Sequence, residues 1–118
     1  MRIRVKRAYE DPAVSDGTRV LVDRLWPRGV TKERARIDLW LKDIAPSPKL
    51  RTWFGHELSK WDEFKQQYQV ELSLNSDGVR TLVDLIKNGQ VTLVYGAKDR
   101  DHNQAVVLKE FLEQKLQH

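Results

Sequence analysis

Three stretches of the chain have the hydrophobic patterns that are typical of β-strands. Residues 2–7 alternate between basic and apolar side chains, with Ile3 and Val5 on one face, which predicts a half-exposed strand near a sheet edge. Arg19–Arg24 encloses a continuous apolar run, and Val91–Tyr95 is apolar almost throughout. Such runs are typical of strands buried on both faces. We therefore predict one edge strand and two central strands.

Apolar residues at helical spacing predict helices between and after these strands. Ser47, which a proline follows, has the signature of a helix N-cap. We expect Ser59 and Asn103 to cap two further helices, and Thr31 to cap a short turn. The apolar faces of the predicted helices are Leu50, Trp53 and Phe54; Trp61, Phe64, Tyr68 and Leu72; Val79, Leu82, Val83 and Ile86; and Ala105, Leu108, Leu112 and Leu116. The brief run Ile37–Ile44 also fits helical spacing and predicts one more short helix.

These elements predict an α/β fold, a small three-layer sandwich with a mostly parallel short sheet flanked by helices. Strands that are apolar throughout need cover on both faces, which the intervening helices can provide. With no linker, repeat or low-complexity run, residues 1–118 are expected to form a single domain. If residues 20–23 and 91–95 are parallel neighbours, their carboxyl ends open at the same edge of the sheet.

Two charged loops follow the predicted central strands. The first carries Asp23, Arg24, Trp26 and Arg28, and the second carries Lys98, Asp99, His102 and Asn103. The second loop leads into the N-terminus of the last helix, where free N–H groups and the helix dipole favour an anion. We predict that these eight residues form a site for a small anionic ligand bearing a phosphate or a carboxylate, bound between Arg28 and the second loop. Arg28 should be exposed at a cleft, with Asp23 and Arg24 substantially buried and hydrogen-bonded to each other or to nearby loops.

Several of these residues also have a purely structural interpretation. Arg24 and Arg28 could bind an anion through their guanidinium groups, or could pair with Asp23, Asp43 or Asp99 as structural ties. Trp26 lies inside the loop, whereas the other tryptophans fit core positions. Lys98 is either an anion ligand or a solvated lysine. The sequence leaves these alternatives open.

The composition restricts the class of protein. A hydrophobic fraction of 40% and a charged fraction of 32% are typical of a globular domain, and no apolar window is long enough to span a membrane. The N-terminus has no apolar stretch resembling a signal peptide, so we expect a cytoplasmic protein. The absence of cysteine excludes disulfides, thiolate metal sites and thiol nucleophiles. Nothing in the composition indicates an oligomeric state.

Positive charge is concentrated in the first third of the chain. Residues 1–36 hold ten Lys and Arg against five Asp and Glu, whereas the whole chain has a net charge of only +4. This excess favours anionic partners and gives an alternative function, a binding module for nucleic acid or an acidic protein. No helix-turn-helix, zinc-finger or exposed aromatic sheet pattern supports nucleic-acid binding, so we rank it second.

Motifs for common cofactors and nucleophiles are absent. The sequence has no Gly-x-Gly-x-x-Gly, no phosphate-binding loop and no Gly-x-Ser-x-Gly turn, so we predict no cofactor. His56 and His102 are the candidate bases near neutral pH, although either could be an ordinary surface histidine. Two histidines at unfavourable spacing and without cysteine do not predict a metal site. Whether the protein is an enzyme stays open.

Four motifs carry a resemblance to a known family. They are Asp-Gly-x-Arg-Val-Leu-Val-Asp-Arg-Leu-Trp-Pro-Arg-Gly at 16–29, Ala-Pro-Ser at 45–47, Trp-Phe-Gly-His at 53–56, and Ala-Lys-Asp at 97–99 followed by His102-Asn103. The chain resembles the YeaO family over nearly its whole length. That family is a domain of unknown function, so the resemblance implies a fold and a site but no reaction. Longer relatives carry a cysteine near the position of Tyr95, and its absence here argues against inherited thiol or phosphatase-like chemistry.

Overall fold

The structure, a computed structural model, describes residues 3–117. Within that range four strands form one sheet: β1 (Ile3–Arg7), β2 (Thr18–Leu21), β3 (Leu39–Trp40) and β4 (Val91–Tyr95). The strand order is β1-β4-β2-β3, and every pairing is parallel. β1 is therefore an edge strand, as its alternating pattern predicts; Arg2, where the predicted strand begins, lies outside the described residues. β2 and β4 are parallel neighbours, which confirms the pairing that aligns their carboxyl ends.

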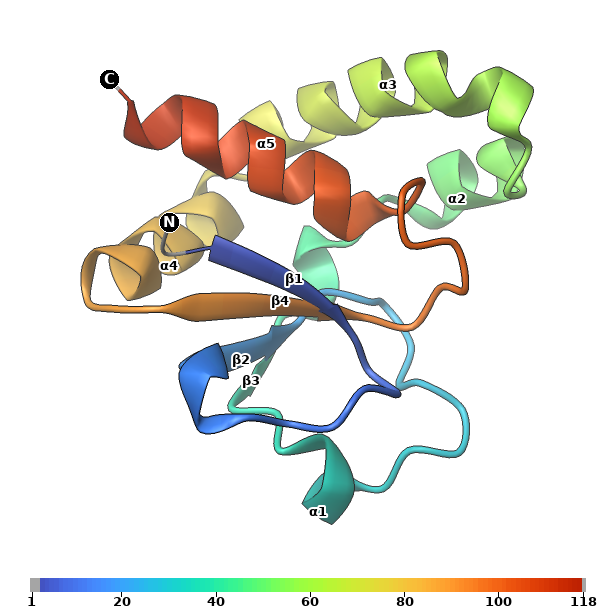
Figure 1. Ribbon diagram of the computed structural model, residues 1–118. Helices are drawn as coiled ribbons and strands as arrows, with labels where there is room; N and C mark the ends of the chain where they lie inside the picture. The colour runs from blue at the N-terminus through green and yellow to red at the C-terminus, as the bar shows by residue number, and fades with distance from the viewer. Residues whose placement is uncertain (1–2, 118) are drawn as a thin grey trace.

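Helices connect the strands and follow the last of them (Figure 1). Their bounds are α1 (Lys32–Ala35), α2 (Pro48–Phe54), α3 (Trp61–Leu74), α4 (Ser76–Lys87) and α5 (Gln104–Leu116), with short 3-10 helices at Val14–Asp16, Lys42–Ile44 and Leu58–Lys60. Side chains of Thr31, Ser47 and Asn103 accept hydrogen bonds from backbone N–H groups in the first turns of α1, α2 and α5. These three predicted N-caps are confirmed.

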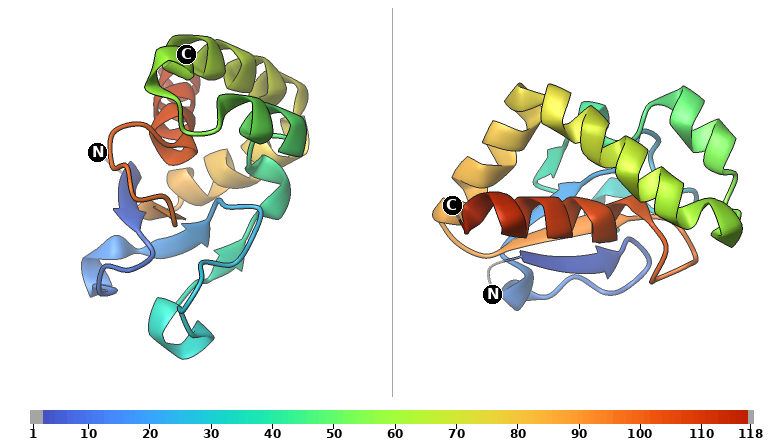
Figure 2. Two further views of the ribbon diagram at one scale, coloured as in Figure 1. Left: turned by 90° about the vertical axis from the view of Figure 1, so that its right-hand side faces the viewer. Right: turned by 90° about the horizontal axis from the view of Figure 1, so that it is seen from above.

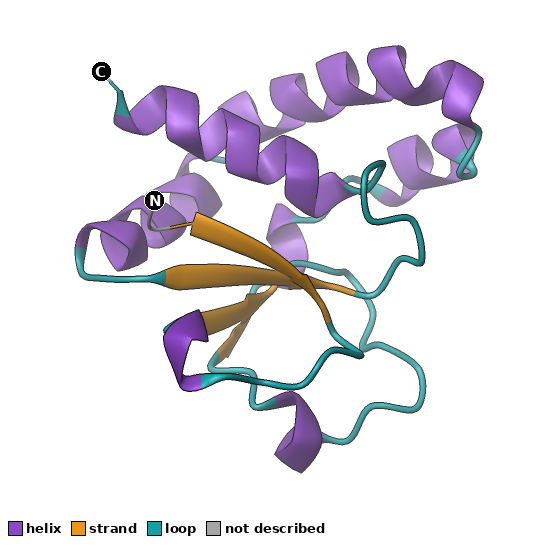
Figure 3. Ribbon diagram, viewed as in Figure 1, coloured by secondary structure: helices purple, strands orange, loops and turns teal. Residues whose placement is uncertain are grey.

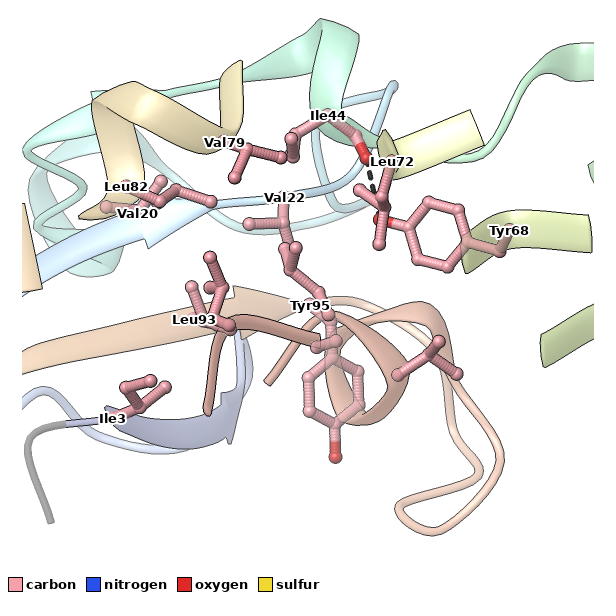
Figure 4. Close-up of a cluster of buried hydrophobic side chains, with 14 of the residues drawn as sticks. Ile3, Val20, Val22, Ile44, Tyr68, Leu72, Val79, Leu82, Leu93 and Tyr95 are labelled. Carbon is pink, nitrogen blue, oxygen red and sulfur yellow. Dashed lines mark hydrogen bonds between the residues drawn. The ribbon is translucent and has the colours of Figure 1, made fainter. Parts of the chain in front are cut away.

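The main core lies between one face of the sheet and the helices α3, α4 and α5 (Figures 1 and 2). Alternate residues of the central strands, such as Val20 and Leu93, point into this layer together with the apolar faces of the helices (Figure 4). Tyr68 is fully buried there, and its hydroxyl donates to the carbonyl of Ile44 at 2.6 Å. This bond ties α3 to the segment that leads into α2.

The opposite face of the sheet is covered by a thinner layer made of loop and α1 (Figure 3). Leu21 and Val94 from the central strands pack there against Trp26, Ile37 and Trp40. Loop residues and a short helix thus complete the predicted three-layer α/β sandwich. Because this layer is thin, the loop that carries Arg24 and Arg28 is held by tryptophan contacts rather than by a long helix.

One predicted helix and one predicted N-cap are wrong, and the end of one strand differs from its prediction. Ile37–Ile44 does not form a helix: it contains β3 and a 3-10 turn, because the N–H of Leu41 bonds to the carbonyl of Leu21 on β2. Ser59 is not an N-cap but lies within the 3-10 helix that precedes α3. β2 ends at Leu21, before the predicted Arg24, although the N–H of Val22 still donates to Val94 at 3.0 Å.

Candidate functional site

A cleft of about 300 Å³ opens at the carboxyl ends of β2 and β4. Its walls come from the loop after β2, the loop after β4, the first turn of α5, and α2 with the residues that flank it. In Figure 1 these segments meet at the right-hand side of the molecule. Of the eight site residues predicted from the sequence, Asp23, Arg24, Trp26, Arg28, His102 and Asn103 line the cleft, whereas Lys98 and Asp99 do not.

Asp23 joins the two loops. One carboxylate oxygen accepts the backbone N–H of Gly96 at 2.9 Å, and the other accepts the side-chain amide of Gln104 in the first turn of α5. Burial raises the pKa of Asp23 above its ordinary value, an effect opposed by these two hydrogen bonds and by the charge of Arg51. A Cβ atom at Gly96 would lie 2.9 Å from the carboxylate, so glycine allows this close approach.

Arg24 contacts the segment that leads into α2. Its guanidinium group donates to the carbonyls of Ala45 and Pro46 at 3.4 Å and lies 3.8 Å from the exposed carboxylate of Asp43. Among the described residues its buried Nε has no hydrogen-bond partner. Asp23 and Arg24 are thus half-buried and bonded to nearby loops rather than to each other. The long contacts leave Arg24 with donor capacity.

Arg28 and Trp26 share one loop but have different surroundings. Arg28 is exposed at the cleft, as its place between a proline and a glycine predicts. Its carbonyl accepts the hydroxyl of Tyr9 at 2.9 Å, while the Trp26 indole donates to Val30 at 2.6 Å and packs edge-on against Trp40. The backbone of this loop is held in place, and the Arg28 side chain stays exposed.

Arg51 is a cleft residue that sequence reasoning missed. It is exposed on α2 and lines the cleft three residues before Phe54, which is buried and lines the same cleft. Residues three apart share a helix face, so Arg51 lies beside the surface that Phe54 contacts. That spacing was the available signal, but using it required knowing where α2 packs. His56 also lines the cleft, and it adopts a positive φ of 58°.

The loop after β4 is built around Asp99. Its carboxylate accepts the backbone N–H groups of Asp101 and His102 at 2.9 and 3.0 Å and contacts His102 Nδ1 at 3.0 Å. These bonds favour the charged carboxylate and lower the pKa of Asp99, with the Asp101 N–H contributing most. The Asn103 side chain donates to the Asp99 carbonyl at 2.9 Å and caps α5. Asp99 therefore shapes the loop, and Lys98 is exposed outside the cleft.

The His102 ring stands between the loop and the helical layer. It makes a T-shaped contact with the Trp61 ring at a centroid distance of 5.1 Å, and its Nδ1 contacts the Asp99 carboxylate. Within residues 3–117, no group of three His, Cys, Asp or Glu side chains is placed to hold a metal ion. Across the same residues, none of the helices has the length and apolar character needed to span a membrane.

Comparison with known proteins identifies the family. The family model described as "Inactive DUF488-N3 subclade" matches residues 2–118. The chain is 42% identical over 112 residues to the "Uncharacterized protein YeaO" of Escherichia coli (strain K12), covering 95% of this chain and 97% of that protein. The chain belongs to this YeaO-like family.

Other YeaO-like relatives come from mycobacteria. The "Uncharacterized protein Rv3073c" of Mycobacterium tuberculosis (strain ATCC 25618 / H37Rv) is 42% identical over 111 residues, covering 94% of this chain and 93% of that protein. The "Uncharacterized protein Mb3100c" of Mycobacterium bovis (strain ATCC BAA-935 / AF2122/97) has the same identity and coverage. No solved structure matches the chain significantly. These names describe a YeaO-like family without an assigned reaction, so function must be argued from the cleft.

Proposed function

We propose that this YeaO-like protein binds a small anionic ligand in the cleft at the carboxyl ends of β2 and β4. The observation that carries the proposal is the charge of the cleft wall. Among the described residues that line it are three arginines, Arg24 and Arg28 from the loop after β2 and Arg51 from α2, and they are accompanied by a single carboxylate, that of Asp23. Cations held together without matching carboxylates favour an anion.

The three arginines retain the capacity to bind such a ligand. Arg28 and Arg51 are exposed, and Arg24 makes only long contacts to two carbonyls and to Asp43. A guanidinium group can donate two parallel hydrogen bonds to a phosphate or a carboxylate, and such charge-assisted bonds are stronger than neutral ones. The first turn of α5 adds the positive end of a helix dipole beside Gln104.

Binding without turnover is the form of the function that we favour. The matching family is described as an inactive subclade. The aspartates near the cleft also have structural roles: Asp23 joins Gly96 to Gln104, and Asp99 holds the loop around His102. A ligand-binding site needs only the cleft arginines and the shape of the cleft.

The alternative function, a nucleic-acid or acidic-protein module based on the basic first third, receives less support. Arg4, Lys6 and Arg19 all extend towards the buried carboxylate of Asp16, at 3.8, 3.1 and 2.7 Å. Arg7 donates to the carbonyl of Ala97. Part of the basic excess therefore has internal partners, which reduces the positive surface available to a polyanion.

Calorimetric titration with inorganic phosphate tests the proposal. We expect Arg28→Ala and Arg51→Ala each to weaken phosphate binding by about tenfold or more, because each removes a charge-assisted hydrogen bond. Arg80→Ala, which removes an exposed arginine from α4, should leave the affinity unchanged.

The location of the site is tested by Lys98→Ala in the same assay. Lys98 is exposed beyond the cleft, so its loss should change the affinity by less than the loss of either cleft arginine. If Lys98→Ala abolishes binding while Arg51→Ala preserves it, the anion sits on the outer loop and the proposed site is wrong. If the wild-type protein binds neither phosphate nor a carboxylate such as propionate, the proposed function itself fails.

A further inference from the structure

Resting on the proposed function, we infer that the ligand is an organic anion that carries a hydroxyl group and donates it to Asp23. A hydroxylated phosphate ester and a hydroxy acid share this chemistry. The arginines bind the charged end of either molecule, and Asp23 distinguishes hydroxylated anions from those without a donor. The inference depends on the size of the cleft, its apolar wall and the surroundings of Asp23.

The cleft is larger than a bare inorganic anion requires. Its volume of about 300 Å³ lies at the lower end of the range of about 300–1,000 Å³ in which proteins bind small organic molecules. Phe54 and Phe64 stack on each other and line it from the helical side, and Pro27 and Pro46 line it from the loops. These apolar groups bind carbon better than water or phosphate oxygen. The ligand therefore has an organic part beside its anionic group.

Asp23 places an acceptor in an otherwise cationic cleft. The backbone of Gly96 and the amide of Gln104 occupy one acceptor position on each carboxylate oxygen. A carboxylate offers about four such positions, so two remain for a ligand. An anion without a donor would be repelled by this carboxylate, whereas an O–H group would form a charge-assisted hydrogen bond with it.

The arginines select a hydroxyl over an ammonium group as the donor. Arg51 is close enough for its charge to act on Asp23, and Arg24 and Arg28 line the same space. An ammonium group that reached Asp23 would be repelled by these three cations, while a neutral hydroxyl would not. A hydroxylated anion satisfies both the arginines and the carboxylate.

Matched ligand pairs test this inference on the wild-type protein. Glycerol 3-phosphate and propyl phosphate have the same carbon chain but differ in two hydroxyl groups, and glycerate and propionate form the corresponding carboxylate pair. We expect the hydroxylated member to bind about tenfold more tightly, because its hydroxyl can donate a charge-assisted hydrogen bond to the Asp23 carboxylate. If both pairs show this ratio, the pair that binds more tightly shows whether the anionic group of the ligand is a phosphate or a carboxylate. O-Phosphoethanolamine, with an ammonium group, should bind more weakly than glycerol 3-phosphate.

Asp23→Asn assigns the effect to the carboxylate. Its amide can accept from Gly96 and, if the Gln104 amide flips, donate to Gln104, so the local bonding is retained. We expect the preference for glycerol 3-phosphate over propyl phosphate to fall to about threefold or less, while inorganic phosphate binds at least as tightly as before. Asp84→Asn removes the same charge from an exposed position on α4 and should keep the full preference.

Failure of the inference can be told apart from failure of the proposed function. Equal binding of propyl phosphate and glycerol 3-phosphate, with the arginine variants still impaired, removes the inference and leaves the anion site standing. Tighter binding of O-phosphoethanolamine overturns the choice of a hydroxyl, and a preference that survives Asp23→Asn overturns the role of Asp23. If neither Arg28→Ala nor Arg51→Ala changes the affinity for the anion, both the proposed site and the inference are wrong. The wild-type comparison stands even if Asp23→Asn does not fold.

Discussion

Asp16 and Asp23 lie on either side of β2, yet their pKa values shift in opposite directions. Burial favours the neutral form of both. For Asp16, hydrogen bonds from the Ala13 N–H, Lys6 and Arg19 outweigh burial and lower the pKa. Among the described residues no cation pairs directly with Asp23, so burial prevails and its pKa is raised. The sequence leaves open a structural tie between Asp23 and Arg24. Among the described residues, Asp16 pairs instead with Arg19 in a buried ion pair, and Asp23 lines the cleft.

Replacing Asp16 with alanine should lower the free energy of unfolding by about 3 kcal/mol or more. The Arg19 side chain is only 4% exposed, and its Nη1 lies 2.7 Å from the Asp16 carboxylate, so the variant buries an unpaired charge. Asp84→Ala, at an exposed position on α4, should change stability by less than about 0.5 kcal/mol. Urea unfolding followed by tryptophan fluorescence measures both.

The same variant carries a pH signature. Because the pKa of Asp16 in the folded state lies below its ordinary value of 3.8, its contribution to stability is present above that pH and is lost as the pH falls through the folded-state pKa. The difference in unfolding free energy between wild type and Asp16→Ala should therefore become smaller in acid. A gap that is constant down to the acid limit of folding would mean that the Asp16 charge does not stabilise the fold.

At the scale of elements, sequence signals that depend on neighbouring residues predicted more of the structure than features that depend on tertiary packing. The caps at Ser47 and Asn103 and the apolar run of β4 depend on neighbouring residues, and the structure confirms them. The predicted helix at Ile37–Ile44 is wrong because β2 recruits Leu39 and Trp40 as a short parallel partner, a contact that the short run does not encode. Arg51 was missed as a cleft residue because the direction in which α2 faces depends on packing against α3.

Two asparagine caps allow the role of α5 to be tested. Asn103 caps α5 and donates to the Asp99 carbonyl, and Asn75 caps α4 and donates to the Asp43 carbonyl. Each alanine variant should therefore lose about 1 kcal/mol of unfolding free energy. Only Asn103→Ala should also weaken phosphate binding, because Asn103 lines the cleft. If both variants change phosphate binding equally, the N-terminus of α5 is not part of the binding site.

At the scale of the whole molecule, the fold divides its positive charge between two places. One group surrounds Asp16 beside the thin layer of the sandwich, where Arg4, Lys6 and Arg19 are partly or wholly neutralised. The other lies in the cleft at the carboxyl ends of β2 and β4. Neither arrangement is visible in the net charge of +4, since both depend on which residues the parallel sheet brings together.

This division predicts weak binding of duplex DNA, with a dissociation constant no tighter than about 10 μM at physiological salt. Nucleic-acid affinity comes mainly from cations spread along a surface that can each replace a phosphate counterion. Here Lys6 and Arg19 have an internal anion, and the cleft gathers its arginines around a space suited to a small molecule. Fluorescence anisotropy with a labelled duplex, at low and at physiological salt, measures the affinity and its salt dependence. Sub-micromolar, sequence-dependent binding at physiological salt would reverse the order of the two functions, and the exposed Arg4 and Arg28 would then be the first residues to replace.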